Sequence, residues 1–162
     1  MISKFLFICV IVGLAALASI HAQLYKVTKV YDGDTITVLD GSSGKYLKIR
    51  FKCIDAPEID QTPWGALSQN RLNQLTPLDT YIQLRNSSLD QYGRTLAEVY
   101  TISGVNINEK LVREGYCVYY YKQSGCGAYK PIQDAAKVEK LNVWSDPNFI
   151  MPWDFRNNKT VV

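Results

Sequence analysis

The chain has 162 residues, and its 18 lysines and arginines only slightly outnumber its 15 aspartates and glutamates, for a net charge of +3. The length suits one domain that buries a core of its own. This excess of positive charge is too small to indicate a nucleic-acid partner. Such a partner has to be inferred from where the charges are placed along the chain.

Residues 1–22 have the layout of a secretory signal peptide. Lys4 supplies a positive charge, Phe5 to Ala18 is an apolar or small stretch, and Ala22 is a small residue before the predicted cut. The stretch is shorter than the about 20 residues that span a bilayer. An uncleaved membrane anchor and a cut after Ala18 are the alternatives. We expect cleavage after Ala22 and no stable membrane association afterwards.

Cleavage would leave a domain at residues 23–146 and a C-terminal tail at residues 147–162. The loss of Lys4 takes one basic residue from 18 and leaves a balance of +2 against 15 acidic residues. His21, the only histidine, is lost as well. The remaining chain therefore has no histidine base, nucleophile or metal ligand, and hydrolysis would rely on carboxylates, arginines and a hard metal ion.

Three cysteines remain after the predicted cut: Cys53, Cys117 and Cys126. An odd number in an exported chain cannot pair completely within one molecule. Cys117 and Cys126 are close in sequence and could close a small loop, or could stay unpaired. Cys53 follows an apolar strand pattern and is predicted to be a buried free thiol. A structural zinc site, which needs four Cys or His ligands, is excluded.

The first half of the chain is strand-like. Leu24–Tyr31 and Thr35–Leu39 are rich in β-branched and aromatic residues, with the turn Asp32-Gly33-Asp34 between them. In Lys45–Ile54 apolar and basic residues alternate. A period of two places one face in the core and directs Arg50 to the other face.

The second half mixes helices and strands. The expected elements are a helix with Thr62 as its cap and Pro63 in its first turn, strands at Tyr81–Arg85 and Arg94–Thr101, a helix at Asn106–Glu114 with a capping box and Gly115 as its stop, and a helix from about Pro131 to Leu141. Five strands in an antiparallel meander with interleaved helices indicate a mainly β, α+β domain. We predict a five-stranded OB-fold barrel with three helices.

Two acidic clusters are candidates for a metal site. Asp32-Gly33-Asp34 is also a common kind of hairpin turn and on its own would be structural. In the run from Arg50 to Glu58, Asp55 ends a strand, and Pro57 restricts the backbone on both sides of the Ala56 carbonyl. Carboxylates and a backbone carbonyl are ligands that a hard divalent cation accepts. The alternative is a solvated loop with an exposed acid pair.

Two arginines complete the candidate site. Arg94 follows Tyr92-Gly93 at the start of a strand, and Arg50 lies in the strand before Asp55. Phosphodiester hydrolysis adds negative charge to the phosphoryl oxygens in the transition state, and guanidinium groups bind such oxygens in pairs. Glu58 is ionised at neutral pH and could orient or deprotonate water.

These motifs resemble the thermonucleases, or staphylococcal nuclease-like domains. The matching segments cover nearly all of residues 24–145 in the family order: Val30–Thr35, Arg50–Glu58, Tyr92–Ala97, Asn108–Gly115 and Glu139–Ser145. The resemblance implies an OB-fold barrel with three helices that hydrolyses DNA and RNA with calcium (Ca²⁺) and leaves 3′-phosphorylated products.

The resemblance also implies which residues would bind the metal. Asp34 and Asp55 would be carboxylate ligands and Ala56 a carbonyl ligand, with Asp32 holding the loop behind them. Ala56 stands where the best-known member has threonine, which matters little for a backbone ligand.

The same resemblance implies the catalytic and substrate-binding residues. Arg50 and Arg94 would bind the scissile phosphate, and Glu58 would be the base or the carboxylate that positions water. Tyr92 would contact the substrate on the phosphate side, and Tyr121 would contact a nucleotide.

Two readings compete with an enzyme. One is a non-catalytic nucleic-acid-binding module of the same fold, and the other is an OB-fold module for a different ligand. Both leave the combination of acids and arginines unexplained. We therefore expect a monomeric, calcium-dependent nuclease with DNA and RNA as substrates, secreted to the periplasm or the extracellular medium.

Overall fold

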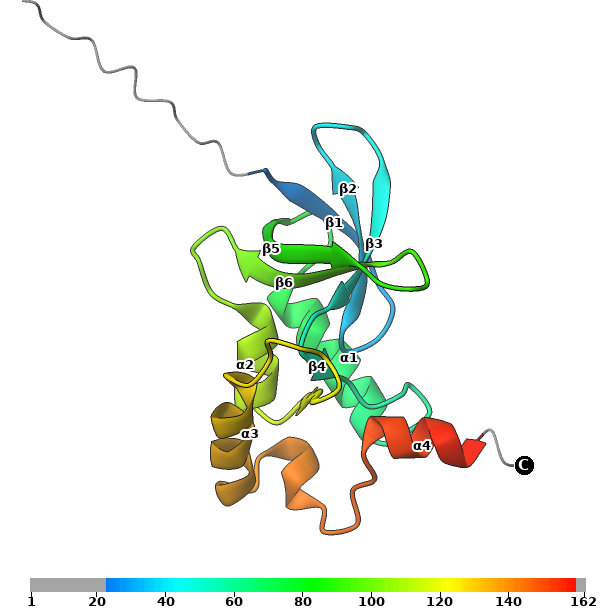
Figure 1. Ribbon diagram of the computed structural model, residues 1–162, viewed down its shortest axis with the longest axis vertical. Helices are drawn as coiled ribbons and strands as arrows, with labels where there is room; N and C mark the ends of the chain where they lie inside the picture. Colours follow the sequence, from blue (N-terminus) through cyan, green and yellow to red (C-terminus); the bar gives the residue numbers. More distant parts are fainter. Residues whose placement is uncertain (1–22, 160–162) are drawn as a thin grey trace, which may run out of the picture.

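A computed structural model describes residues 23–159 of the chain, shown in Figure 1. A closed barrel occupies one half of the molecule, and helices lie below it. The predicted signal peptide and its cut lie outside the described residues. Within residues 23–159, no helix combines the length and apolar character that a bilayer crossing requires.

The barrel has the strand order β1-β2-β3-β6-β5. Its strands are β1 (Tyr25–Val30), β2 (Thr35–Asp40), β3 (Tyr46–Phe51), β5 (Tyr81–Leu89) and β6 (Thr95–Thr101). The predicted five-stranded barrel and α+β class are thus confirmed. The purely antiparallel meander is wrong, because β3 pairs with β6 in parallel, and this pairing closes the barrel.

The period-two pattern explains the core. Alternate side chains of the strands are fully buried inside the barrel: Val27, Ile36, Val38, Ile49, Phe51, Ala97 and Val99. Burying each of the larger aliphatic or aromatic side chains contributes about 1.5 to 3 kcal/mol. Arg50 lies between two of these buried residues on β3 and therefore faces away from the barrel interior, as expected.

Three helices pack at one end of the barrel: α1 (Trp64–Leu75), α2 (Ile107–Arg113) and α3 (Tyr129–Val138). The predicted cap of α2 is present, because the Asn106 side chain accepts a hydrogen bond from the Glu109 N–H. The predicted Thr62 cap is wrong. Pro63 occupies the cap position of α1, and no side chain hydrogen-bonds there.

Asn108 fixes α2 to the barrel. Its side-chain oxygen accepts a hydrogen bond from the Val99 N–H at 2.9 Å, and its amide donates to the carbonyls of Lys52 at 2.9 Å and Ala97 at 3.2 Å. Asn108 is fully buried, so these bonds compensate for the loss of water. They fix the helix layer beneath the strands that carry the candidate site.

The predicted C-terminal tail is folded within residues 147–159. A short 3₁₀ helix, η1 (Asn142–Ser145), leads into the tail, which ends in a fourth helix, α4 (Pro152–Lys159). Phe149 packs edge-on against Trp64 of α1 and Trp144 of η1, with ring centroids 6.5 and 5.8 Å apart. The tail is therefore an additional helical element beside the three predicted helices.

The cysteine prediction needs correction. Cys53 and Cys126 form a disulfide, with Cα atoms 5.2 Å apart, and Cys117 is the buried free thiol. Cys53 has a φ of 68°, so the chain turns after β3 and brings this residue to the loop before α3. Closeness in sequence misled the prediction, because disulfide formation depends on Cα distance in the fold.

The turn between β2 and β3 predicts an acid-sensitive contribution to stability. The carboxylate of Asp40 accepts hydrogen bonds from the hydroxyls of Ser43 and Ser42 and from the side-chain amide of Gln23. These bonds, with that of Ser43 contributing most, hold the pKa of Asp40 well below its usual value. A carboxylate whose pKa is lower in the folded than in the unfolded protein stabilises the fold fully at pH values above its unfolded-state pKa of about 3.9. This stabilisation is lost as the pH falls through the pKa of the folded state.

Asp40→Asn is therefore expected to lower the melting temperature by a few degrees at neutral pH, and by less below about pH 3. Thermal unfolding at both pH values measures this difference. Asp79→Asn, which removes an exposed partner of Lys26, is the control and should change little. An equal effect of Asp40→Asn at both pH values would contradict the assignment.

Candidate active site

The loop between β1 and β2 places Asp32 and Asp34 at the end of the barrel. The Asp32 carboxylate accepts a hydrogen bond from the Asp34 N–H at 2.9 Å, which holds the turn. Gly33 lies against α1 so closely that an added Cβ would be 1.8 Å from the Ser68 hydroxyl. This contact requires glycine and fixes the acidic loop on the helix layer.

Strand register brings Arg50 to this loop. Arg50 pairs with Thr35 across β2 and β3, and its Nη1 lies 2.9 Å from Asp34 Oδ2. Its Nη2 lies 2.7 Å from Asp55 Oδ1. Nη1 also donates to the carbonyls of Phe51 and Ile54. Arg50 thus links the two acidic clusters, with its side chain only 12% exposed.

The segment after β3 carries Asp55, Ala56 and Glu58. It starts with β4 (Ile54–Asp55), a short strand that pairs with β7 (Val118–Tyr119). Asp55 is 1% exposed. The Ala56 N–H donates to Asp34 Oδ2 at 2.6 Å, so the two acidic clusters also share a backbone contact.

Gly65, at the start of α1, packs closely against the backbone of Glu58. A Cβ on Gly65 would lie 1.9 Å from the Glu58 carbonyl oxygen. The start of α1 therefore supports the backbone below the Glu58 carboxylate. Glu58 lines the same cavity as Asp34 and Asp55.

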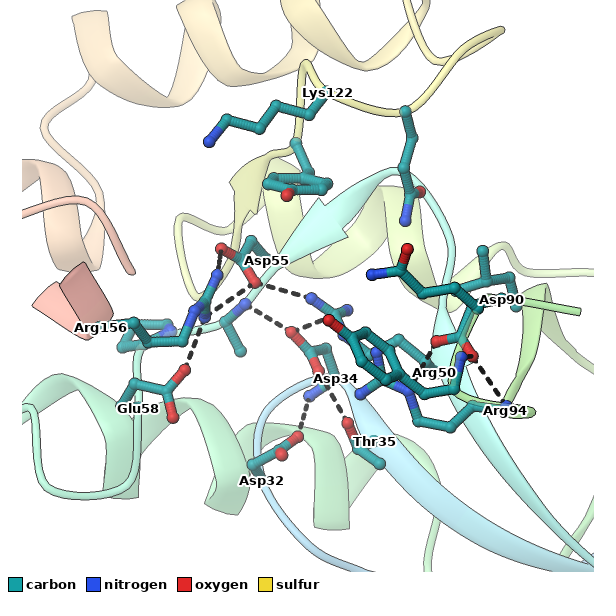
Figure 2. A pocket seen from close by; sticks show the side chains of 17 residues that line it. Asp32, Asp34, Thr35, Arg50, Asp55, Glu58, Asp90, Arg94, Lys122 and Arg156 are labelled. Carbon is teal, nitrogen blue, oxygen red and sulfur yellow. Dashed lines mark hydrogen bonds and ion pairs between the residues drawn. The ribbon is translucent and has the colours of Figure 1, made fainter. Parts of the chain in front are cut away.

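Arg94 forms another wall of the site. Its Nε donates to Asp90 Oδ2 at 2.7 Å, and its backbone N–H donates to Asp90 Oδ1 at 2.8 Å. The ring of Tyr92 lies 5.5 Å from the Arg94 guanidinium and is 74% exposed. Figure 2 shows Arg94 and Asp90 on the opposite side of Arg50 from Glu58.

The loop after β7 completes the cavity with Tyr120, Lys122 and Gln123. The Tyr120 N–H donates to the Cys53 carbonyl at 2.9 Å, and the Cys53 N–H donates to Gln123 Oε1 at 2.6 Å. Together with the Cys53–Cys126 disulfide, these contacts bind the loop to the turn that follows β3, the strand of Arg50.

The structure brings eight of the nine predicted site residues around one cavity of about 730 Å³: Asp32, Asp34, Arg50, Asp55, Ala56, Glu58, Tyr92 and Arg94. Tyr121 is not among the residues that line it. Its ring is 57% exposed and packs against Trp153 of α4, with centroids 5.5 Å apart. The neighbouring Tyr120 lines the cavity instead. The nucleotide contact predicted for Tyr121 therefore receives no support from its position.

Arg156 of α4 is the functional candidate that the sequence did not indicate. Its Nη2 lies 2.7 Å from Asp55 Oδ2, and its Nη1 lies 2.6 Å from Glu58 Oε1. Figure 2 shows its guanidinium between these two carboxylates. Arg156 therefore contacts two acids of the site although it lies about 100 positions away from both in the sequence.

Burial and crowding of charges shape the electrostatics. Burial, then the charge of Asp34, raises the pKa of Asp32 to about 7. Burial raises the pKa of Asp55, and the guanidinium of Arg50 opposes this shift. For Arg50 burial acts to lower the pKa, but the carboxylates of Asp34 and Asp55 outweigh it and raise it. The guanidinium is therefore fully charged.

Known proteins match this chain over most of its length. The family described as "Staphylococcal nuclease homologue" matches residues 48–146. An "Uncharacterized endonuclease" of Escherichia coli is 37% identical over 147 residues, 88% of either chain. The "Micrococcal nuclease" of Shigella flexneri is 33% identical over 160 residues, 92% of this chain and 87% of that protein. The "Thermonuclease" of Staphylococcus hyicus is 33% identical over 141 residues, 82% of either chain.

The chain belongs to the staphylococcal nuclease family. The predicted resemblance is confirmed, and the family membership supports nuclease activity, a hydrolysis of nucleic acid. Asp32, Asp34 and Arg156 lie outside residues 48–146, so the cavity of this family member includes residues on both sides of the matched range.

The donor set of this staphylococcal nuclease homologue suits a hard divalent cation. Asp34 and Asp55 face one cavity, are 4% and 1% exposed, and provide the oxygens that such a cation prefers. Within residues 23–159, however, no three His, Cys, Asp or Glu side chains converge as a ready metal cluster. Guanidinium groups lie between the acids instead: Arg50 joins Asp34 to Asp55, and Arg156 joins Asp55 to Glu58.

Proposed function

We propose that this family member is an exported, calcium-dependent nuclease that hydrolyses phosphodiester bonds of DNA and RNA and leaves 3′-phosphorylated ends. The observation that carries the proposal is the cavity that joins two buried carboxylates, Glu58 and two arginines. A cation held by Asp34, Asp55 and the Ala56 carbonyl would neutralise negative charge on the phosphoryl group. Calcium, the product polarity and the use of both substrates are parts of the proposal drawn from the family resemblance.

Both arginines retain donors for a phosphate. Within residues 23–159, no hydrogen bond from Arg50 Nε is found, and the contacts of Arg94 involve its Nε and backbone N–H. Free N–H groups of a guanidinium bind phosphate oxygens in pairs. Arg50 and Arg94 would thus bind the scissile phosphate, with the exposed Tyr92 ring beside Arg94.

Glu58 is the carboxylate best placed to act on water. Its side chain is 36% exposed, whereas Asp34 and Asp55 are almost fully buried. An exposed carboxylate has access to solvent and can accept a proton or orient the attacking water. Asp32 would act indirectly, because its carboxylate holds the Asp34 backbone through one hydrogen bond.

An oxidising compartment fits the disulfide. Cys53–Cys126 joins the turn after β3 to the loop of Tyr120 and Lys122, and disulfides persist mainly in exported proteins. We therefore propose export through the signal peptide predicted at residues 1–22, and action as a monomer.

The purified protein is expected to cut single-stranded DNA and RNA with calcium and to stop when a chelator is added. Glu58→Ala/Arg94→Ala should reduce cleavage by at least about 1,000-fold, because it removes a proton acceptor and a guanidinium that donates hydrogen bonds to the phosphate. The control Glu109→Ala/Arg113→Ala removes an exposed Glu–Arg pair on α2 and should cleave normally. Gel electrophoresis of DNA and RNA oligonucleotides measures both rates.

Two outcomes would decide against this assignment. Undiminished cleavage by Glu58→Ala/Arg94→Ala would remove these residues from the chemistry. Binding of DNA without any cleavage by the wild type would favour a non-catalytic module of the same fold.

A further inference from the structure

The last helix is held in a defined place beside the active site. Trp153 of α4 packs against Tyr120 and Tyr121, with ring centroids 5.9 and 5.5 Å apart. Just before α4, the Ile150 carbonyl accepts a hydrogen bond from the side chain of Gln61. The helix is thus attached to the loop after β7 on one side and to the loop before α1 on the other.

This attachment directs Arg156 to two acids of the site. The guanidinium contacts both oxygens of Asp55, at 3.3 Å for Oδ1 and 2.7 Å for Oδ2, and Oε1 of Glu58 at 2.6 Å. Asp55 is buried, whereas the Arg156 side chain is 41% exposed. Arg156 therefore reaches from the surface to a carboxylate that the rest of the chain encloses (Figure 2).

Asp55 now has two positive neighbours. Arg50 contacts its Oδ1 from β3, and Arg156 contacts both of its oxygens from α4. The guanidinium of Arg156 is charged at every pH at which the protein is folded. A divalent cation at Asp55 would meet the repulsion of this fixed charge.

We propose that Arg156 is an internal counterion that competes with the catalytic cation: it holds Asp55 and Glu58 together before a cation binds, and a cation must displace it from Asp55. The C-terminal helix thereby weakens the cation affinity of the site and sets the cation concentration at which the enzyme works. Arg156 acts through the two carboxylates and is a positioning residue. This inference rests on the cation-dependent nuclease proposed above.

A purely structural Arg156 leads to a different expectation. If the ion pairs only attached α4 to the domain, loss of the side chain would lower the melting temperature and would leave cation affinity unchanged or weaker. Competition predicts the opposite change in affinity. Cation binding in the absence of substrate separates the two roles.

The test compares calcium binding to wild type, Arg156→Met, Arg156→Gln and Arg156→Lys by isothermal titration calorimetry without nucleic acid. Arg156→Met and Arg156→Gln should bind calcium at least about tenfold more tightly, because the competing charge is absent. Arg156→Lys keeps the charge but cannot bridge both carboxylates with a planar fork, so its calcium affinity should lie between that of wild type and those of the neutral variants. Arg113→Met removes an arginine from an ion pair outside the cavity and should equal wild type.

A second readout uses the reaction. The calcium concentration for half-maximal cleavage should fall in Arg156→Met and Arg156→Gln by the same factor as the dissociation constant. Circular dichroism checks that each variant is folded. Because methionine is apolar whereas glutamine is polar and can hydrogen-bond, an effect that both variants share reports the lost charge.

Three outcomes are informative. Calcium affinity that is equal to or weaker than wild type in both neutral variants would overturn the inference alone. Absence of calcium binding in every protein would overturn it together with the proposed metal dependence. Tighter binding by the variants, with no cleavage by any protein, would support the competition between Arg156 and the cation, and would refute both the nuclease proposal and the role of Arg156 in setting a working cation concentration.

Discussion

Replacing Arg50 with methionine is expected to slow cleavage strongly and to destabilise the fold at the same time. Cleavage should fall by at least about 100-fold, because one donor to the developing phosphoryl charge is lost. The free energy of unfolding should fall by about 3 kcal/mol, the lower end of the range for breaking a buried ion pair. The lower end applies because Arg156 still compensates Asp55 after Arg50 is removed.

Arg94→Met is the matched comparison. Its side chain is 35% exposed and pairs with Asp90 near the surface, so the free energy of unfolding should change by no more than about 1 kcal/mol. Its effect on cleavage should resemble that of Arg50→Met, since both arginines are proposed to bind the phosphate. The pair therefore separates a donor that also stabilises the fold from one that acts only on substrate.

Denaturant unfolding, monitored by tryptophan fluorescence, measures the free energy of unfolding. Cleavage rates at saturating calcium measure activity. Arg71→Met removes one of the two ion-pair partners of Glu114, which lies outside the cavity, and should retain full activity. Wild-type activity in Arg50→Met would refute the phosphate contact. Equal stability losses in Arg50→Met and Arg94→Met would contradict the difference in burial.

Removal of the Cys53–Cys126 disulfide should have the other large effect. Cys53→Ala/Cys126→Ala is expected to lower the free energy of unfolding by about 2 to 5 kcal/mol, because the bond closes a loop across a sequence separation of 73. The loop with Tyr120, Lys122 and Gln123 should also become less fixed beside the cavity. We expect weaker substrate binding, seen as a rise in KM for DNA.

A reducing agent provides the control for this prediction. Reduction should destabilise the wild type by the same amount and should leave Cys53→Ala/Cys126→Ala unchanged. Alkylation of the unfolded, unreduced wild type should label Cys117 alone among the three cysteines of residues 23–162, as mass spectrometry can show. Labelling of all three would contradict the disulfide.

Local sequence patterns predicted much of the barrel and the site. Alternation along Lys45–Ile54 placed Arg50 outside the barrel core, and the acids at Asp34 and Asp55 follow directly from two short motifs. These features depend on neighbours in sequence, where strand period and turn chemistry decide the geometry. The structure then brings both motifs to one cavity through the pairing of β2 with β3.

Features that depend on distant contacts were not predictable in the same way. The parallel pairing of β3 with β6, the partner of Cys53 and the contact of Arg156 with Asp55 each join segments far apart in the chain. The packing of Trp153 of α4 on Tyr120 and Tyr121 is likewise a contact between distant segments that no local pattern indicates. Tyr120 and Tyr121 both pack on Trp153, but Tyr120 lines the cavity and Tyr121 does not, so the nucleotide contact of Tyr121 stays a prediction.

The position of Arg156 also has a practical consequence for producing the protein. Lys159 ends α4 only three residues later, about 4.5 Å along the helix axis. An affinity tag or fluorescent fusion attached after this helix would follow Arg156 within a few residues, and Arg156 contacts Asp55, one of the two acids proposed to hold the cation. Tags belong before Gln23, at the start of the barrel, and kinetic constants from C-terminally tagged protein should be compared with those from tag-free protein.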